Sequence, residues 1–315
     1  MAIKLGVIMD PIHAIKFEKD STLAMLSEAQ KRRYQIYYIE QKDLFSQQGK
    51  SYASMRPLKV FDDKANWFNL GGPEVIPLGE LDVILMRKDP PFDMNFIYTT
   101  YLLDEAEKSG CLVVNKPQSL RDCNEKFFAT EFPQCCPELL VSQDHSRILD
   151  FIKQYKDVVV KPLDGMGGQS IFRIKQGDPN TNVILETLTD DGQIPIMTQV
   201  FIPKVSAGDK RILLIDGEPV SSGLLRIPAK GELRGNLAAG GTGKVAPLTD
   251  RDYWICEQVA PTLVAKGLIF VGIDVIGDYL TEINVTSPTC IREIDKATGL
   301  NISSTLMDCI ELKLN

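Results

Sequence analysis

Three polar side chains set into an apolar hairpin constrain this chain more than any other feature of its sequence. Two apolar runs on either side of a Gly-Asp turn signal predict a β-hairpin, Phe270–Ile276 and Leu280–Val285. The polar side chains within these runs are Asp274, Glu282 and Asn284. Because Glu282 and Asn284 are two residues apart, they lie on one face of the second strand.

The register of the hairpin decides whether Asp274 joins that face. A two-residue turn would set Ile273 opposite Glu282, whereas a three-residue connection pairs Ile273 with Ile283 and Asp274 with Glu282. Since the hydrophobic pattern sets the register, we expect the three-residue connection. One face then presents two carboxylates and an amide, which are oxygen ligands suited to Mg²⁺ or Mn²⁺. From the hairpin alone, a solvated polar face is the alternative.

Length and composition predict a soluble globular protein of two or three domains. The chain has 315 residues, of which 44% are hydrophobic and 24% are charged. The net charge of −7 and the lack of a long basic run argue against nucleic acid and anionic membranes as partners. The apolar run Ile3–Met9 is too short for a secretion signal, and none approaches the roughly 18 residues of a membrane span. We therefore expect neither a signal peptide nor a membrane span.

Cysteine and histidine usage narrows the compartment and the chemistry. The seven cysteines are scattered, and none belongs to a C-x-x-C pair. An odd number without a disulfide framework favours a reducing compartment, so we expect a cytoplasmic protein. Only two histidines occur, His13 and His145. This argues against histidine-centred hydrolysis and against zinc chemistry, because both depend on imidazole.

Alternation of strands and helices over residues 1–122 predicts a small parallel α/β domain. The expected strands are Ile3–Met9, Gln35–Glu40, Asp82–Arg87 and Leu112–Asn115, and the expected helices are Asp20–Arg33 and Asp93–Ser109. Only short strands are expected within Lys42–Gly79, which prolines and glycines interrupt. Ligands bind beyond the carboxyl ends of strands in such sheets. The loops after Met9 and Met86 are therefore expected to face a substrate.

A glycine-rich loop between two strands predicts a phosphate-binding element. Strand Val158–Lys161 leads into loop Asp164–Ser170, and strand Ile171–Ile174 follows. This order excludes the dinucleotide-binding fingerprint, which needs a helix after the loop. Glycines let backbone N–H groups approach phosphate oxygens, and Lys161 would add a positive charge. The glycines concerned are Gly165, Gly167 and Gly168. A flexible turn is the alternative.

Two further segments are candidates for contact with a nucleotide. A second lysine, Lys126, lies on an expected helix near Asn124–Glu131. An apolar run ends in four residues that can offer main-chain groups to an adenine edge, Gln199, Val200, Phe201 and Ile202.

The glycine-rich segment Ile227–Val245 is long for a connection inside a compact domain. Long loops of this kind are usually functional, so we expect an active-site lid that carries Arg234 and Asn236. A disordered linker is the alternative. Thr249 is expected to cap a helix that runs to about Lys266 and leads into the polar hairpin.

Together these elements resemble the ATP-grasp fold, and six blocks resemble bacterial glutathione synthetases. The blocks run through nearly the whole chain: KDPPFD (88–93), NKPQSLRDCNEK (115–126), KPLDGMGG (161–168), RGNLAAGG (234–241), FVGIDVIGD (270–278) and TEINVTSPTCIREI (281–294). The resemblance implies a ligase that uses ATP to join γ-glutamylcysteine to glycine through an acyl phosphate, giving glutathione, ADP and phosphate. It also implies a tetramer. Another ATP-grasp dipeptide or glutamate ligase, or a non-catalytic ATP-binding protein, is the alternative.

The implied architecture is α/β, with α+β character in the ATP-grasp part. An N-terminal α/β domain (residues 1–122) precedes a two-lobed ATP-grasp module. Its lid subdomain is expected at residues 123–200 and its catalytic subdomain at 201–315, with a mobile loop at 227–243.

The resemblance also implies roles for individual residues, assigned by position. Contacts to ATP fall to Lys126, Lys161, Gly165, Gly167, Gly168, Gln199, Val200, Phe201 and Ile202. Substrate and lid contacts fall to Arg211, Arg226, Arg234 and Asn236. The ligands for Mg²⁺ or Mn²⁺ are Asp274, Glu282 and Asn284. Gln169 and Thr242 depart from the family pattern, which bears on loop dynamics and nucleotide affinity.

Overall fold

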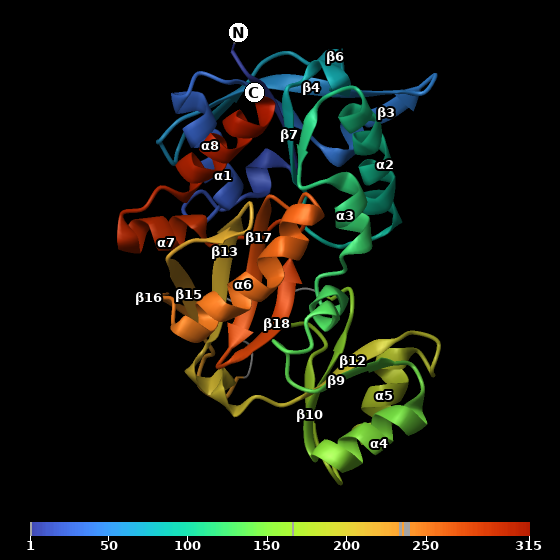
Figure 1. The fold of residues 1–315 in the computed structure, drawn as a ribbon. Helices are drawn as coiled ribbons and strands as arrows, with labels where there is room; N and C mark the ends of the chain where they lie inside the picture. The colour runs from blue at the N-terminus through green and yellow to red at the C-terminus, as the bar shows by residue number, and fades with distance from the viewer. Residues whose placement is uncertain (1, 166, 233–234, 236–239) are drawn as a thin grey trace.

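The structure is a computed structural model that describes residues 2–165, 167–232, 235 and 240–315. Figure 1 shows three β-sheets along the molecule, with the N-terminal sheet at one end, a six-stranded sheet in the middle and a four-stranded sheet at the other end. Both chain termini lie beside the N-terminal sheet. Among the described residues, no helix is long and apolar enough to cross a membrane.

The N-terminal sheet is built on parallel strands in the order β2-β1-β7-β8. Their bounds are β1 Lys4–Met9, β2 Gln35–Ile39, β7 Val83–Arg87 and β8 Leu112–Val114. The helices that accompany them are η1 Ile12–Ala14, α1 Ser21–Lys31 and α2 Met94–Lys108. Asp20 and Asp93 cap α1 and α2 by accepting hydrogen bonds from backbone N–H groups three residues on. The predicted parallel α/β domain is confirmed.

Residues 42–79 form an antiparallel extension of this sheet, and the expectation of only short strands is wrong. β4 runs over 11 residues, Lys50–Val60, and pairs with β2 and three shorter strands. The other elements of the extension are η2 Gln41–Asp43, β3 Leu44–Gln47, β5 Phe68–Leu70, β6 Glu74–Pro77 and η3 Leu78–Glu80. Burial alternates along β4, as in a strand with one exposed face. Its polar residues and its proline make such a strand hard to recognise in the sequence.

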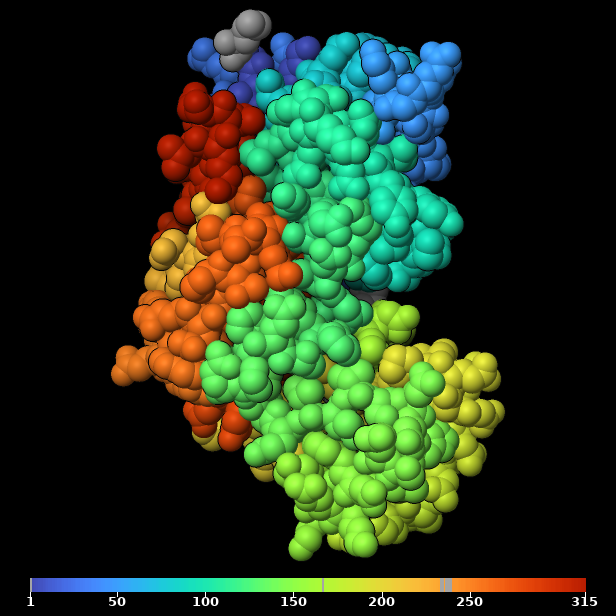
Figure 2. All heavy atoms as spheres, turned by 45° about the vertical axis from the view of Figure 1, so that its right-hand side comes forward, coloured from blue at the N-terminus to red at the C-terminus, as the bar shows by residue number. Residues whose placement is uncertain are grey.

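The small lobe, residues 139–200, is an antiparallel sheet in the order β11-β10-β12-β9 with two helices. Its elements are β9 Leu139–Ser142, α4 His145–Tyr155, β10 Asp157–Pro162, β11 Phe172–Lys175, α5 Thr181–Thr189 and β12 Ile196–Val200. Its buried apolar side chains form a cluster of their own, from Ile148 to Ile196. Figure 2 shows this lobe, in light green to yellow, projecting from the rest of the molecule.

The linker segment, residues 115–136, connects the N-terminal sheet to the small lobe. It contains α3 Pro117–Asp122 and the 3₁₀ helix η4 Phe127–Glu131. The helix expected near Asn124–Glu131 is therefore shorter and of the 3₁₀ type, and Lys126 stands just before it. Buried side chains of the segment belong to the same apolar cluster as the six-stranded sheet: Cys123, Phe128, Ala129, Phe132, Cys135 and Cys136.

The large lobe is the six-stranded sheet and the helices around it. The strand order is β16-β15-β13-β17-β18, with β14 paired to β13. The elements are η5 Pro203–Ala207, β13 Asp209–Ile215, β14 Glu218–Pro219, β15 Ser222–Ile227, β16 Thr242–Pro247, α6 Asp250–Ala265, β17 Phe270–Ile276, β18 Tyr279–Asn284, α7 Ile291–Thr298 and α8 Ile302–Leu314. Thr249 caps α6 in a capping box, as expected, and α8 packs on α1 of the N-terminal domain.

The β17–β18 hairpin combines both registers considered for it. The turn is the two-residue Gly277-Asp278 turn, so the expected three-residue connection is wrong. Asp274 nevertheless pairs with Glu282, and Ile273 with Ile283, as predicted. A β-bulge after Asp274 reconciles the two registers by inserting one extra residue, Thr281, into β18.

The loop expected at residues 227–243 ends earlier than predicted, because the next strand begins at Thr242. Residues 242 and 243 belong to β16, whose first pair joins Ile227 of β15 to Thr242. Arg234 and Asn236 lie outside the described residues.

Candidate active site

A cavity of about 150 Å³ lies between the small lobe and the large lobe. The small lobe, the linker segment and the large lobe all contribute to its lining. All nine residues predicted to contact ATP line it: Lys126, Lys161, Gly165, Gly167, Gly168, Gln199, Val200, Phe201 and Ile202. Asp274 and Glu282 of the β17–β18 hairpin line it as well. Residues separated by more than a hundred positions in the sequence thus meet at one pocket.

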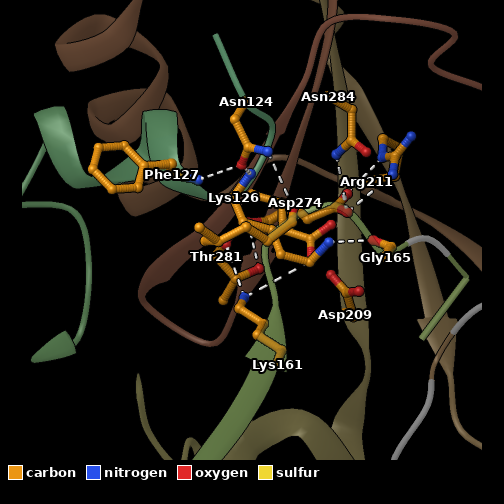
Figure 3. A network of polar contacts seen from close by, with 12 residues as sticks. Asn124, Lys126, Phe127, Lys161, Gly165, Asp209, Arg211, Asp274, Thr281 and Asn284 are labelled. Carbon is orange, nitrogen blue, oxygen red and sulfur yellow. Dashed lines mark hydrogen bonds and ion pairs between the residues drawn. The ribbon is translucent and has the colours of Figure 1, made fainter. Parts of the chain in front are cut away.

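Two buried lysines approach the pocket from different elements (Figure 3). Lys161 Nζ lies 3.3 Å from the carbonyl oxygen of Thr281, to which it donates, and 3.8 Å from Glu282 Oε1. Burial lowers the pKa of Lys161 below its ordinary value, although Glu282 opposes this. Lys126 donates from Nζ to the carbonyl of Gly165 in the glycine-rich loop. Each ammonium group thus donates to a neutral carbonyl, with Glu282 also near Lys161, and both lie at the cavity, where they can meet an anion.

Asp274 lies at the centre of a buried ion cluster. Arg211 donates from Nε and Nη2 to its two carboxylate oxygens, at 2.5 and 2.9 Å, and Arg226 Nη2 lies 2.9 Å from Oδ1. The amide of Asn284 donates to Oδ2 at 3.2 Å. Burial disfavours the charged carboxylate, but the two arginines outweigh burial and hold the pKa of Asp274 below its ordinary value. The carboxylate is therefore ionised and has a fixed orientation.

The two arginines predicted to contact substrate thus bind a predicted metal ligand. Arg211 and Arg226 belong to the second layer of the site, because neither lines the cavity. Figure 3 shows Arg211, Asp274 and Asn284 grouped beside the lysines. The structure brings the predicted basic, acidic and amide side chains together, but it pairs them with one another.

Asp209 is a site residue that the motifs did not reveal. It lines the cavity, and its Oδ2 accepts a hydrogen bond from Arg226 Nη2 at 2.5 Å. Its other carboxylate oxygen is buried and has no partner among the described residues. Burial raises the pKa of Asp209 to about 7, against the pull of Arg226. The signal in the sequence is its spacing, since Asp209 and Arg211 are two residues apart and share one face of β13.

The hairpin supplies a donor set of the kind that suits Mg²⁺ or Mn²⁺. Asp274 and Glu282 are directly opposite each other, and the Glu282 side chain is 24% exposed toward the cavity. In the described part of the chain, no group of three or more His, Cys, Asp or Glu side chains could hold a metal. Mg²⁺ is commonly bound by one or two carboxylates together with phosphate oxygens and water. Two carboxylates and an amide fit that pattern.

An aromatic side chain of the cavity lining, Phe201, is held by contacts to β10 and β11. The guanidinium of Arg173 lies 3.6 Å from the ring centroid of Phe201, and it also binds Asp157 through two hydrogen bonds of 2.8 and 2.6 Å. The N–H of Phe201 donates to the carbonyl of Asp157. These contacts join β10, β11 and the residues after β12 at the place predicted for an adenine edge.

Comparisons with known proteins agree with this arrangement. A family model described as the N-terminal domain of prokaryotic glutathione synthetase matches residues 3–121, and one described as its ATP-grasp domain matches residues 125–299. The chain is 63% identical over 314 residues to the glutathione synthetase of Pseudomonas putida, covering 100% of this chain and 99% of the relative. It is 57% identical over 312 residues to that of Vibrio cholerae, covering 99% of this chain and 98% of the relative.

Solved structures at low identity share the fold. The D-cycloserine synthetase DcsG aligns with a TM-score of 0.67 at 11% identity, over 99% of this chain and 100% of that one. The D-alanine–D-alanine ligase of Bacillus anthracis, solved with ATP, aligns with a TM-score of 0.60 at 16% identity, over 98% of this chain and 96% of that one.

Proposed function

The chain belongs to the prokaryotic glutathione synthetase family, and from that membership we propose how its central pocket carries out the family reaction. The protein is an ATP-dependent ligase that joins γ-L-glutamyl-L-cysteine to glycine and forms glutathione, ADP and phosphate. The observation that carries the proposal is that the residues predicted to contact ATP line one cavity beside the polar hairpin.

The nucleotide lies in the cavity between the lobes. The adenine is placed against Gln199–Ile202, where Phe201 is braced by Arg173. The phosphates lie against the glycine-rich loop and exchange the carbonyl partners of Lys126 and Lys161 for their own oxygens. Because burial still penalises the Lys161 ammonium despite Glu282 at 3.8 Å, an anionic ligand is a natural further partner for it.

The reaction requires a divalent metal, and we assign it to the hairpin. Asp274, Glu282 and Asn284 are the residues that would hold Mg²⁺ or Mn²⁺. When bound, the metal neutralises phosphate charge. Arg211 and Arg226 keep Asp274 ionised and oriented, so these arginines act on the site through Asp274.

The chemistry needs positioning more than a catalytic base. A carboxylate oxygen of γ-glutamylcysteine attacks the γ-phosphorus of ATP, and ADP leaves. The amine of glycine, having lost a proton, then attacks the acyl carbon, and phosphate leaves. Lys126 and Lys161 stabilise the charge on the transferred group. The connection between β15 and β16 serves as a cover that excludes water from the acyl phosphate. Its described residue Gly235 lines the cavity.

ADP release with purified protein tests the proposal. We expect release to depend on γ-glutamylcysteine and glycine together. D-Alanine or glutamate in place of glycine should not support it. ADP release with those amines instead would identify another ATP-grasp ligase, and binding of ATP without turnover would identify a non-catalytic protein.

Oligomeric state and location extend the proposal. We assign a homotetramer and a cytoplasmic location. Seven free cysteines, of which six are buried, suit a reducing compartment. Sedimentation of the purified protein tests the tetramer.

A further inference from the structure

Three consecutive residues of the linker segment contact two different lobes. Asn124 donates from Nδ2 to the carbonyl of Leu163 at 3.2 Å, and Lys126 donates from Nζ to the carbonyl of Gly165. Both acceptors belong to the loop of the small lobe. Glu125, between them, binds the large lobe instead. This tripeptide is therefore the place where the cavity's two walls are joined.

The Glu125 carboxylate holds the end of β18. Its Oε1 accepts hydrogen bonds from the N–H groups of Val285 and Thr286, at 2.9 and 3.0 Å, and from the Thr286 hydroxyl at 2.8 Å. The Glu125 carbonyl accepts a fourth, from the N–H of Ile283 at 2.8 Å. These four hydrogen bonds lie on both sides of Asn284, one of the residues assigned to the metal.

The linker segment packs against β18 along the strand's length. In the sheet formed by the described residues β18 is the last strand, so one of its edges has no neighbouring strand there. The linker covers that edge through Ile283 and, further along, through the N–H of Leu280, which donates to the carbonyl of Cys135 at 2.8 Å. The apolar side chains of the linker and of β18 share one cluster.

Asn115 holds the same strand end from the other side. Its Nδ2 donates to the carbonyls of Val285 and Phe270, both at 2.7 Å, and its Oδ1 accepts from the N–H of Phe270 at 2.8 Å. Val285 is thus bound through its N–H by Glu125 and through its carbonyl by Asn115. A residue bonded on both backbone groups leaves its neighbour Asn284 little freedom to shift.

We propose that Glu125 is a positioning residue that fixes Glu282 and Asn284 relative to Lys126. The inference rests on the proposed function, in which Lys126 meets the phosphates and the hairpin residues hold the metal. Both must reach the same triphosphate, and a misplacement of about 1 Å can cost about a hundredfold in rate. Glu125 sets this spacing because its own carboxylate binds the end of β18 and the next residue in the chain is Lys126.

The required property of Glu125 is its acceptor oxygen. All three side-chain hydrogen bonds converge on Oε1. Glutamine has a carbonyl oxygen at that position and can accept the same three donors. Burial raises the pKa of Glu125 above its ordinary value, because desolvation disfavours the charged carboxylate. We therefore expect glutamine at position 125 to preserve these hydrogen bonds and alanine to lose them.

The experiment compares Glu125→Ala and Glu125→Gln with the parent protein and with Glu131→Ala, a control that removes an exposed carboxylate from the same segment. Calorimetry measures the affinity for ADP in the presence of Mg²⁺, and steady-state kinetics measures kcat and each KM. We expect Glu125→Ala to weaken Mg²⁺-dependent ADP affinity and to lower kcat, each about tenfold or more, with little change in the KM for glycine. Glu125→Gln and Glu131→Ala should match the parent.

Two results would overturn the proposal. If Glu125→Ala only lowers the melting temperature and leaves ADP affinity and kcat unchanged where it is folded, Glu125 is merely structural. If Glu125→Gln fails as badly as alanine and selectively raises the KM for glycine, Glu125 binds the substrate by its charge. Failure of the proposed function is distinguishable, since it would appear as absent ligation by the parent protein itself.

Discussion

Asp274 shows how much a residue's role depends on its neighbours. Sequence spacing placed it on the face of Glu282, and the structure confirms that pairing. Spacing could not reveal that Arg211 and Arg226 converge on the same carboxylate, because both come from other strands, β13 and β15. Spacing alone puts Asp209 on the same face of β13 as Arg211, but its burial and its partner Arg226 arise only in the folded sheet.

A first prediction concerns Lys161, which is buried for function at a cost in stability. Lys161→Met should abolish ligation yet stabilise the free protein by about 1 kcal/mol, because burial penalises the ammonium by more than its contact with Glu282 returns. Urea unfolding at neutral pH, without nucleotide, measures the difference. Lys153→Met, which alters an exposed lysine of α4, is the control and should not stabilise. A Met variant less stable than the parent would contradict the argument.

The stability of Lys161→Met relative to the parent should also depend on pH. Burial lowers the pKa of Lys161 in the folded state, so between that value and the ordinary one the unfolded chain binds more protons. The free energy of unfolding of the parent therefore rises with pH through this window. The advantage of Lys161→Met should shrink as the pH approaches about 10.4, the ordinary lysine value. An advantage that is constant or grows would show that desolvation of the ammonium is not its cause.

A second prediction is that the cysteines take no part in the reaction. Burial raises the pKa of the thiols, to about 12 for Cys111, Cys136 and Cys256 and to about 11 for Cys123. Since the thiolate is the reactive form, alkylation at pH 8 should be slow in the folded protein and fast in urea. Half-buried Cys309 should react first. A buried cysteine that reacts at its unfolded rate would contradict this assignment.

At the scale of elements, the hairpin shows what pattern reading can and cannot supply. The two strands and the facing of the carboxylates could be predicted because two apolar runs flank the turn and the hydrophobic pattern matches Ile273 with Ile283. The turn length was misjudged because a regular ladder was assumed throughout. Leu280 and Ile283 are both fully buried although three residues apart, and that spacing is itself the signal of a bulge.

Other elements are harder to predict from the sequence. The long strand β4 is interrupted by Pro57, and no helix was expected at α3, α5 or α7. α5 buries few side chains, since it covers one face of a small sheet. Tertiary packing determines whether such elements form. Helices α1, α2 and α6, in contrast, can be predicted from the capping residues at their N-termini.

A third prediction tests the bulge. Thr281 donates from Oγ1 to the carbonyl of Asp274 at 3.1 Å, and its own carbonyl accepts from Lys161. Thr281→Val keeps the shape but loses the donated hydrogen bond, so it should lower the free energy of unfolding by about 1 kcal/mol. Thr281→Ser, which keeps the hydroxyl, should be milder. Chemical denaturation of both variants provides the measurement, and a serine variant less stable than valine would contradict the role of the hydroxyl.

At the scale of the molecule, two bodies with separate cores share one cavity. The small lobe has its own apolar cluster, while the linker segment belongs to a cluster that the large lobe shares with the N-terminal domain. The predicted start of the lid subdomain at residue 123 rests on the sequence motifs. We propose instead that the small lobe begins after Cys136, where the buried side chains of the linker end. Such boundaries depend on which core a side chain enters, and periodicity along the chain does not report that.

The last prediction follows from this division. The cavity is lined by Lys161, Gly165 and Gln199 from the small lobe and by Asp274 and Glu282 from the large lobe. A nucleotide bound there bridges bodies that otherwise meet through few elements, and it must slow local opening of the lobe with the smaller core. Addition of ADP and Mg²⁺ should therefore slow amide hydrogen exchange across β10, β11 and β12.

Exchange in β1, which lies in the N-terminal sheet away from the cavity, is the internal control and should hardly change. The same measurement on Lys161→Met separates binding from solvent effects, since that variant should lose the protection. Equal protection of β1 and β10 would mean that the chain responds as a single cooperative unit. The division into two bodies would then be wrong, because a ligand can protect distant strands equally only when they open together.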